Sequence, residues 1–360
     1  MKSYRVVQWG TGNVGGEALR SILDAPHLEL AGVRVYTKEK HGVDAGTLLG
    51  RDPVGVAATT RIEDILATDA DCVSYMPRIA DLDDVCRLLE SGKSVVATPF
   101  LFYAHALPAA DRDRVERACA AGGSSVCGMG IHPGFVGMVL PLALSGAVRR
   151  VDRITVQERA NWDFYDSPRI TFDNMRFGRD PEDATLAANP FARFNSDLFQ
   201  QQIHMLGAGL DAGLDEVTEE QILVTAEEGF DVAAGHIAAG TVRGQRYRWC
   251  GLAGGVRRIE IEALWTLGPD YPEGWPRPKD GWTITIEGEP SLRSHFISLA
   301  SFERKDATIE EHVHSADIVT AVQAIHAIPS LCDAPPGIRS PLDLPAPRST
   351  LGFGASTRSA

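Results

Sequence analysis

The chain has 360 residues, of which 44% are hydrophobic and 23% are charged. This is roughly two to three times the commonest domain size, so we expect two domains or one large α/β domain, and the composition excludes disordered, collagen-like and disulfide-scaffold proteins. The 35 Lys and Arg against 48 Asp and Glu give a formal net charge of −13, which argues against nucleic acid and anionic membrane surfaces as partners.

The first part of the chain alternates short β-type runs with amphipathic helical patterns. This alternation is typical of a parallel sheet with crossover helices. The expected strands are 4–9, 28–36, 71–75, 94–98 and 124–128. The expected helices are 13–24, 81–91 and 111–121.

The pattern changes after residue 128, where a second domain is expected to begin. Residues 151–159 alternate as a half-exposed strand, 196–239 favour helix, and 240–305 contains alternating runs such as 256–266 and 282–287. This indicates an antiparallel sheet with helices. A last helix is expected over 316–326, capped by Ser315 and ended by Pro329.

A glycine-rich turn directly follows the first strand and opens the first helix. It reads Gly10-Thr11-Gly12-Asn13-Val14-Gly15, a GxGxxG pattern in the strand–turn–helix setting that dinucleotide binding requires. The first glycine permits the tight turn, the second lets the backbone approach a pyrophosphate, and the third allows helix and strand to pack closely. The free N–H groups at the helix start attract the negative charge. The sequence therefore predicts a Rossmann-type nucleotide site.

The end of the second strand favours NADP over NAD. An NAD site usually places Asp or Glu there to hold the ribose hydroxyls, and no acid stands at that position. The strand instead runs through Arg34 and leads into hydroxyls and cations, namely Tyr36, Thr37, Lys38 and Lys40. NAD stays possible because Glu39 lies nearby, and an ordinary solvated loop would also explain the two lysines.

Four segments, in order along the chain, carry a family resemblance. VVQWGTGNVG (6–15), VRVYTKEKHGVDAG (33–46), MGIHPGFVG (129–137) and HAIPSLCDAPPG (326–337) resemble the dihydrodipicolinate reductase-like superfamily, near the 2,4-diaminopentanoate dehydrogenases and native amine dehydrogenases. The resemblance implies hydride transfer between NAD(P)H and an imine or carbonyl carbon. It also implies that Met76-Pro77 and Thr98-Pro99 lie near the ribose and nicotinamide, at the strand ends where ligands of such sheets gather.

Pattern and resemblance together predict an α/β chain. Residues 1–130 form a Rossmann domain with a doubly wound parallel sheet, and 131–314 form an α+β substrate and dimerisation domain with an open, mostly antiparallel sheet. Residues 315–345 hold a C-terminal helix that packs back on the N-terminal domain, and 346–360 form a flexible tail. A homodimer is expected from the resemblance alone.

Two departures from the family bear on the chemistry. Amine dehydrogenases carry a catalytic glutamate shortly after the Thr98 position, where this chain continues with apolar residues from Pro99 to Phe102. The family's Asn-Pro-Gly is His132-Pro133-Gly134 here, and the Asn of a late Asn-Ala-Ile-Pro motif is His326.

Three residues are candidates for the proton chemistry. His132 lies in the segment joining the domains and titrates in the useful range, although a histidine there could equally hold a backbone carbonyl. Tyr103 lies where relatives keep their acid, and it could donate a hydrogen bond if a nearby cation lowered its pKa. Glu158 could supply the missing carboxylate, although a Glu-Arg pair on an alternating strand is usually structural.

No metal site is indicated, because the histidines lack an accompanying cysteine or carboxylate pattern. The six cysteines include no C-x-x-C pair, and an apolar run begins within three residues of the first Met, leaving no room for a signal peptide. No run approaches the roughly 18 apolar residues of a membrane helix. We therefore expect a cytoplasmic protein.

The leading hypothesis is an NAD(P)H-dependent oxidoreductase acting on a carbonyl or imine carbon of a small, largely apolar substrate, with Phe100–Tyr103 as a selecting wall. An amine dehydrogenase is the alternative, weakened by the missing glutamate and restored if Glu158 takes its place. A third hypothesis, from another class, is a catalytically inactive NADP-binding sensor.

Overall fold

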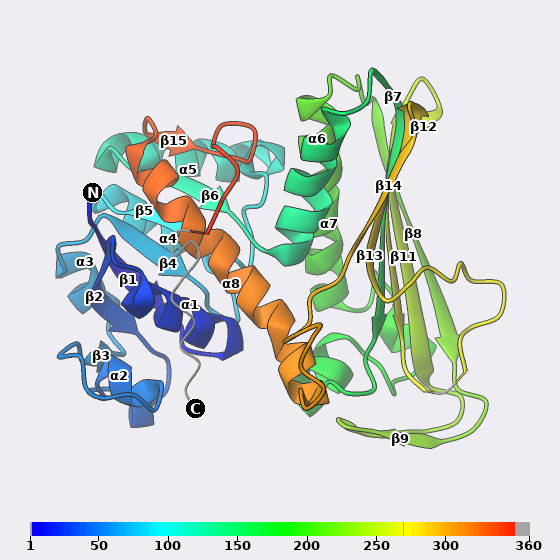
Figure 1. Ribbon diagram of the computed structural model, residues 1–360, viewed down its shortest axis with the longest axis horizontal. Helices are drawn as coiled ribbons and strands as arrows, with labels where there is room; N and C mark the ends of the chain where they lie inside the picture. Colours follow the sequence, from blue (N-terminus) through cyan, green and yellow to red (C-terminus); the bar gives the residue numbers. More distant parts are fainter. Residues whose placement is uncertain (1, 269, 350–360) are drawn as a thin grey trace. The chain divides into compact units, whose positions relative to one another are not determined.

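The computed structural model describes residues 2–268 and 270–349 (Figure 1). The chain divides into two compact units: Met1–Ile131 with Asp317–Ala360 forms unit 1, and His132–Ala316 forms unit 2. Unit 2 thus begins one residue, and ends two residues, after the predicted second domain of 131–314. Of the expected flexible tail, 350–360 lies outside the described residues.

Unit 1 is built on a seven-stranded parallel sheet with the order β15-β6-β5-β4-β1-β2-β3. Its strands are β1 (Tyr4–Trp9), β2 (Leu28–Arg34), β3 (Ala58–Thr59), β4 (Cys72–Tyr75), β5 (Ser94–Ala97), β6 (Ser125–Gly128) and β15 (Gly337–Ile338). The chain winds outward from β1 first through β2 and β3, and then on the other side through β4, β5 and β6. In open sheets of this kind, ligands bind at the point where the strand order reverses, which here is the carboxyl end of β1 beside β4.

Helices cover both faces of this sheet. They are α1 (Asn13–Asp24), η1 (Lys38–Lys40), α2 (Ala45–Leu48), α3 (Ile62–Ala67), α4 (Leu82–Glu90), η2 (Ala104–Ala106), α5 (Ala109–Gly122) and the part of α8 (Ile309–Asp333) that belongs to unit 1. Ile22 of α1 and Ile325 and Leu331 of α8 lie in one buried cluster with strand side chains such as Val6. The C-terminal helix therefore belongs to the core of unit 1.

Helix α8 is longer than the sequence predicted. It spans Ile309–Asp333, so Ser315 lies inside it, where its hydroxyl donates to the backbone carbonyl of His312 at 2.6 Å. Pro329 also lies inside and does not end the helix. A proline there forgoes one helical hydrogen bond. Ile328 and Leu331, on either side of it, are fully buried and anchor this part of the helix in the core of unit 1.

Unit 2 is built on a six-stranded sheet with the order β14-β13-β7-β12-β11-β8. Only the β7–β12 pair is parallel, so the sheet is mostly antiparallel. The strands are β7 (Arg150–Asn161), β8 (Glu216–Thr225), β11 (Val242–Ala253), β12 (Val256–Thr266), β13 (Gly281–Glu289) and β14 (Leu292–Phe296), with β9 (Phe230–Val232) and β10 (Gly235–Ile237) as a separate hairpin. The two sheets together confirm the predicted fold class.

The helical elements of unit 2 are η3 (Ile131–Val139), α6 (Leu140–Ser145), η4 (Arg169–Asn174), η5 (Pro181–Ala184) and α7 (Pro190–Gly209). The prediction of mostly helix over 196–239 was wrong beyond Gly209, since β8, β9 and β10 follow. Strand β8 pairs with β11 along one edge of the sheet, and none of its residues is buried. Its sequence therefore lacks the alternation of buried apolar and exposed polar residues by which a strand is recognised.

Candidate active site

The glycine loop of unit 1 has the geometry that a dinucleotide pyrophosphate needs. Gly10 has φ +90°, and a Cβ there would meet the carbonyl oxygen of Met76 at 2.5 Å. A Cβ on Gly15 would meet the carbonyl oxygen of Gly10 at 2.3 Å, so helix and turn pack tightly. A Cβ on Gly12 would meet nothing within 4 Å. The loop is closed on two sides and open at Gly12.

Helix α1 begins at Asn13 without a capping side chain. Its N-cap residue is Gly12, which has no side chain to cap the helix, and no acidic residue lies in the first turn. The helix start therefore keeps backbone N–H groups and a partial positive charge for a phosphate. The residues present fit a dinucleotide.

Gly12→Ala is expected to abolish dinucleotide binding while leaving the fold intact. The added methyl group meets no protein atom, but it occupies the side from which a pyrophosphate approaches. The measurement is a fluorescence titration with NADPH and NADH, together with thermal unfolding. The matched control is Gly16→Ala, which also points into open space but lies within α1 and should bind normally. Normal binding by Gly12→Ala would contradict this role.

The two proline loops lie at the same edge of the sheet as the glycine loop. Met76-Pro77 follows β4, and the Met76 N–H donates to the carbonyl of Trp9 at 2.8 Å. Thr98-Pro99 follows β5, and the Thr98 N–H donates to the carbonyl of Tyr75 at 3.2 Å. Both loops therefore sit where parallel strands end and ligands gather.

The end of β2 brings cations beside the glycine loop. Arg34, its last residue, lies over the rings of Trp9 and Tyr36 at 5.4 and 5.0 Å, and Trp9 Nε1 donates to the Tyr36 hydroxyl at 2.8 Å. Lys40 Nζ donates to the backbone carbonyl and to Oγ1 of Thr11, each at 3.1 Å. Thr37 and Lys38 are exposed.

Arg34 was absent from the predicted site residues. Its position in the sequence carried the signal, because it stands where an NAD site would have its acid.

Tyr103 lacks the lowered pKa that its predicted role as a proton donor requires. It lies in unit 1 just before η2, and burial together with the charge of Asp343 raises its pKa, whereas the predicted role required a cation that lowers it. The apolar segment before it is packed rather than open, since Phe100, Leu101 and Phe102 are all buried. Leu101 also has φ +65°, and its backbone lies against Gly128, so this segment is tightly held.

The other two candidates, His132 and Glu158, form a buried pair in unit 2. The distance from His132 Nδ1 to Glu158 Oε2 is 2.5 Å, and the two side chains are 1% and 13% exposed. Trp265 Nε1 donates to Glu158 Oε1 at 2.9 Å, and Trp282 Nε1 lies 3.1 Å from His132 Nδ1. The ring of Phe199 meets the imidazole edge-on at 4.9 Å. A carboxylate and an imidazole are thus enclosed by aromatic side chains.

Glu158 is held in its ionised form. Burial by itself would raise its pKa, but hydrogen bonds from His132, Trp265 and Trp282 and the charge of His132 outweigh burial and lower the pKa. An ionised carboxylate accepts hydrogen bonds only, so Nδ1 of His132 carries the proton between them. Whenever the imidazole is neutral, its free lone pair is therefore on Nε2, which is buried and has no hydrogen-bond partner. Nε2 is therefore the atom able to take up and release a proton.

Strand register explains why these residues meet. Glu158 on β7 lies directly opposite Trp282 on β13 and Ala263 on β12, so Trp265, two residues along β12, shares its face. Arg159 points to the other face, where it pairs with Asp280 at 3.0 Å. His132 enters from the segment before α6, in which Gly134 has φ +128°, a conformation suited to glycine. The aromatic partners were missed because the sequence does not reveal register.

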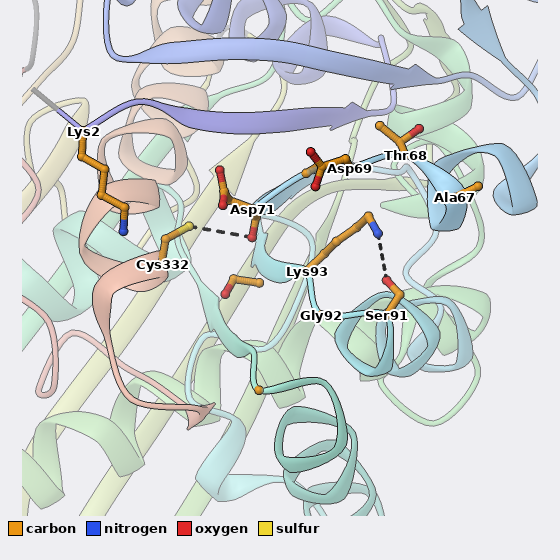
Figure 2. Close-up of a pocket in the computed structure, with 12 residues that line it drawn as sticks. Lys2, Ala67, Thr68, Asp69, Asp71, Ser91, Gly92, Lys93 and Cys332 are labelled. Atoms are coloured by element: carbon orange, nitrogen blue, oxygen red, sulfur yellow. Dashed lines mark hydrogen bonds between the residues drawn. The ribbon is translucent and has the colours of Figure 1, made fainter.

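A separate cavity of about 560 Å³ lies at the amino ends of the strands of unit 1 (Figure 2). Lys93 in its wall is only 4% exposed, and its Nζ donates to the carbonyl of Leu66 and to Ser91 Oγ at 3.0 and 3.2 Å. Cys332 and Asp71 also line it. Since Lys93 binds the end of α3, we interpret its role as structural.

Within the described residues, no cluster of three or more His, Cys, Asp or Glu could hold a metal ion. None of the helices in the described part combines the length and apolar character that a membrane crossing requires.

Comparisons with known proteins agree with this geometry. A family model, the 2,4-diaminopentanoate dehydrogenase C-terminal domain, matches residues 194–358. An amine dehydrogenase from Streptomyces virginiae is 32% identical over 354 residues, which covers 94% of this chain and 95% of that protein. The chain belongs to the amine dehydrogenase family. The predicted resemblance and the predicted oxidoreductase class are therefore confirmed.

Two solved structures share the fold. The amine dehydrogenase from Mycobacterium smegmatis has a TM-score of 0.73 at 20% identity, covering 96% of this chain and 97% of its own. GenD2 from gentamicin A biosynthesis, solved in complex with NAD, has a TM-score of 0.55 at 16% identity, covering 95% of this chain and 90% of its own. The homodimer and the cytoplasmic location stay predictions.

Proposed function

We propose that this member of the amine dehydrogenase family is an NADP(H)-dependent amine dehydrogenase. It interconverts a small, largely apolar amine with the corresponding ketone or aldehyde and ammonia. The buried His132–Glu158 pair carries the proposal, because it supplies an acid–base group to a chain that lacks the family's glutamate after Thr98. The substrate-side chemistry thereby moves from unit 1 to unit 2.

The glycine loop and the end of β2 hold the cofactor in this proposal. Open backbone at Gly12 and the free N–H groups of α1 bind the pyrophosphate, and Met76-Pro77 and Thr98-Pro99 border the ribose and nicotinamide. Arg34 and Lys40 bind the 2′-phosphate, with Tyr36, Thr37 and Lys38 around them. When bound, the dinucleotide supplies or accepts the hydride.

His132 and Glu158 handle the protons. Amine oxidation requires a base at the substrate nitrogen, and ketone amination requires an acid for the departing oxygen as water leaves. Nε2 of His132 takes up the proton in the first direction and returns it in the second. Glu158 stays ionised, holds Nδ1–H, and stabilises the imidazolium that forms.

Lys40→Ala is expected to raise KM for NADPH by about tenfold, and to change KM for NADH little. The lysine amine lies against Thr11 and would contact a 2′-phosphate, and a hydrogen bond between charged groups contributes about 1.5–3 kcal/mol. Steady-state kinetics with each cofactor give the comparison. Lys38→Ala is the matched control, since Lys38 is exposed and should have a smaller effect. Equal effects of Lys40→Ala on both cofactors would refute the phosphate role.

The proposed activity is tested with the purified chain, NADPH and a panel of small cyclic and aliphatic ketones, with and without ammonium. Ammonium-dependent oxidation of NADPH supports the proposal. Ammonium-independent oxidation makes the protein a carbonyl reductase, which the missing acid after Thr98 favours. Dinucleotide binding without turnover of any compound makes it a sensor.

A further inference from the structure

Three buried polar atoms without hydrogen-bond partners gather beside the His132–Glu158 pair. They are Nε2 of His132 and both Oε1 and Nε2 of Gln202 on α7. Gln202 is fully buried, and the His132 side chain is 1% exposed. Buried polar groups in native proteins are nearly always paired, so three in one place call for a functional explanation.

The surroundings of Gly137 show how closely these groups lie. A Cβ on Gly137 would meet Oε1 of Gln202 at 1.6 Å and Cδ2 of His132 at 2.8 Å. Cδ2 is bonded to Nε2, so the ring edge that carries the unpaired nitrogen lies beside the Gln202 amide. Phe199, one helical turn earlier on α7, contacts the same imidazole. One face of α7 thus packs a ring and an amide against His132.

The chemistry of Nε2 sets what its partner must do. Nδ1 is engaged with Glu158, so Nε2 is bare in the neutral imidazole and carries N–H in the imidazolium. A partner in a buried site must therefore donate in one state and accept in the other. A primary amide does both, because rotation about its last side-chain bond exchanges its NH₂ and its oxygen.

We propose that Gln202 is a positioning residue whose amide donates to or accepts from Nε2 of His132 whenever the substrate nitrogen does not, so that the buried imidazole keeps a partner in both protonation states. This rests on the proposed function, in which His132 exchanges a proton with the substrate. The charged group that contacts His132 is Glu158 of β7. The other neighbours, Phe199 and Gln202 of α7 and Trp282 of β13, carry no charge.

Two substitutions at Gln202 test the proposal in opposite directions. Gln202→Glu adds a carboxylate that favours the imidazolium, so the acidic limb of the kcat/KM profile for amine oxidation should move up by about one pH unit. Gln202→Leu removes the acceptor for the charged form, whose hydrogen bond is the stronger one, so the limb should move down. Gln201→Leu, a buried neighbour on α7, should leave the limb in place.

A measurement without turnover keeps the test independent of the proposed activity. ¹³C NMR titration of the full chain, with histidines labelled at Cε1 and His132 identified by its loss in His132→Asn, reports the pKa in each Gln202 variant. Opposite pKa shifts in the two Gln202 variants support the positioning role even if no amine is turned over. The absence of turnover would overturn the proposed function alone. Shifts in the same direction, or none beyond that of Gln201→Leu, overturn the positioning role.

Discussion

His132→Asn is expected to lower kcat for amine oxidation by about 10²- to 10⁴-fold, the usual contribution of a general acid–base group. Asparagine cannot exchange a proton near neutral pH, and it leaves Glu158 without the imidazole that it pairs with. KM for NADP⁺ should stay near its original value, since Gly10–Gly15 lies in unit 1. Steady-state kinetics at saturating substrate separate the two parameters.

The control for this substitution is His204→Asn. His204 is a histidine of α7 in the same unit, and it is exposed. Its replacement should leave kcat unchanged. A His132→Asn enzyme with unchanged kcat would assign His132 to structure and remove the acid–base pair from the proposal.

Glu158→Gln is expected to reduce kcat by about 100-fold and to move the acidic limb of kcat/KM to lower pH. Without the carboxylate the imidazolium loses its stabilising charge. The amide NH₂ can also donate to Nδ1, which favours the tautomer with the proton on Nε2 and removes the base. A pH profile of kcat/KM from pH 5 to pH 9 checks both effects.

Glu262→Gln is the matched control for charge and burial. Glu262 is 1% exposed and pairs with Arg246 at 2.6 Å, but it lies on the other face of the sheet, since its partner on β7 is Gln157. It should lower stability without moving the pH profile. A profile that moves equally in both variants would contradict the assignment of Glu158.

Glu158 should also contribute to stability in a pH-dependent way. Its pKa in the folded chain lies below its ordinary value of 4.5, so the unfolded state binds the proton more readily. The contribution, on the order of 2 kcal/mol for hydrogen bonds to a charged group, is present above pH 4.5 and is lost as pH falls below it. Urea unfolding of wild type and Glu158→Gln should therefore differ more at pH 7 than at pH 4.

The features that were predicted well from the sequence depend on residues close together along the chain. The helix 13–24 and the strand 256–266 match α1 and β12 to the residue, because periodicity is a local signal. The turn Gly10–Gly15 needs only its own strand and helix. Residues 196–239 and the ends of α8 failed because an edge strand and a packed proline are governed by contacts distant in sequence.

In the candidate site, too, single residues could be predicted from the sequence, whereas the contacts between them could not. His132 and Glu158 were proposed singly, and nothing in the sequence joins them, since they lie 26 residues apart on different elements. Trp282 reaches the pair only because β13 aligns with β7 in one register. Gln202 depends further on how α7 packs against Gly137.

The measurement that tests the proposed function most directly follows two isotope labels, one in ammonium and one in NADPH. The purified chain is incubated with a small ketone, ¹⁵N-ammonium and NADPH carrying deuterium at both C4 positions, and the product is analysed by mass spectrometry. We expect an amine that carries deuterium on its carbon and ¹⁵N on its nitrogen, and we expect His132→Asn to form it far more slowly. A deuterated alcohol as the product, or equal rates of amine formation in the two proteins, would contradict the proposed function.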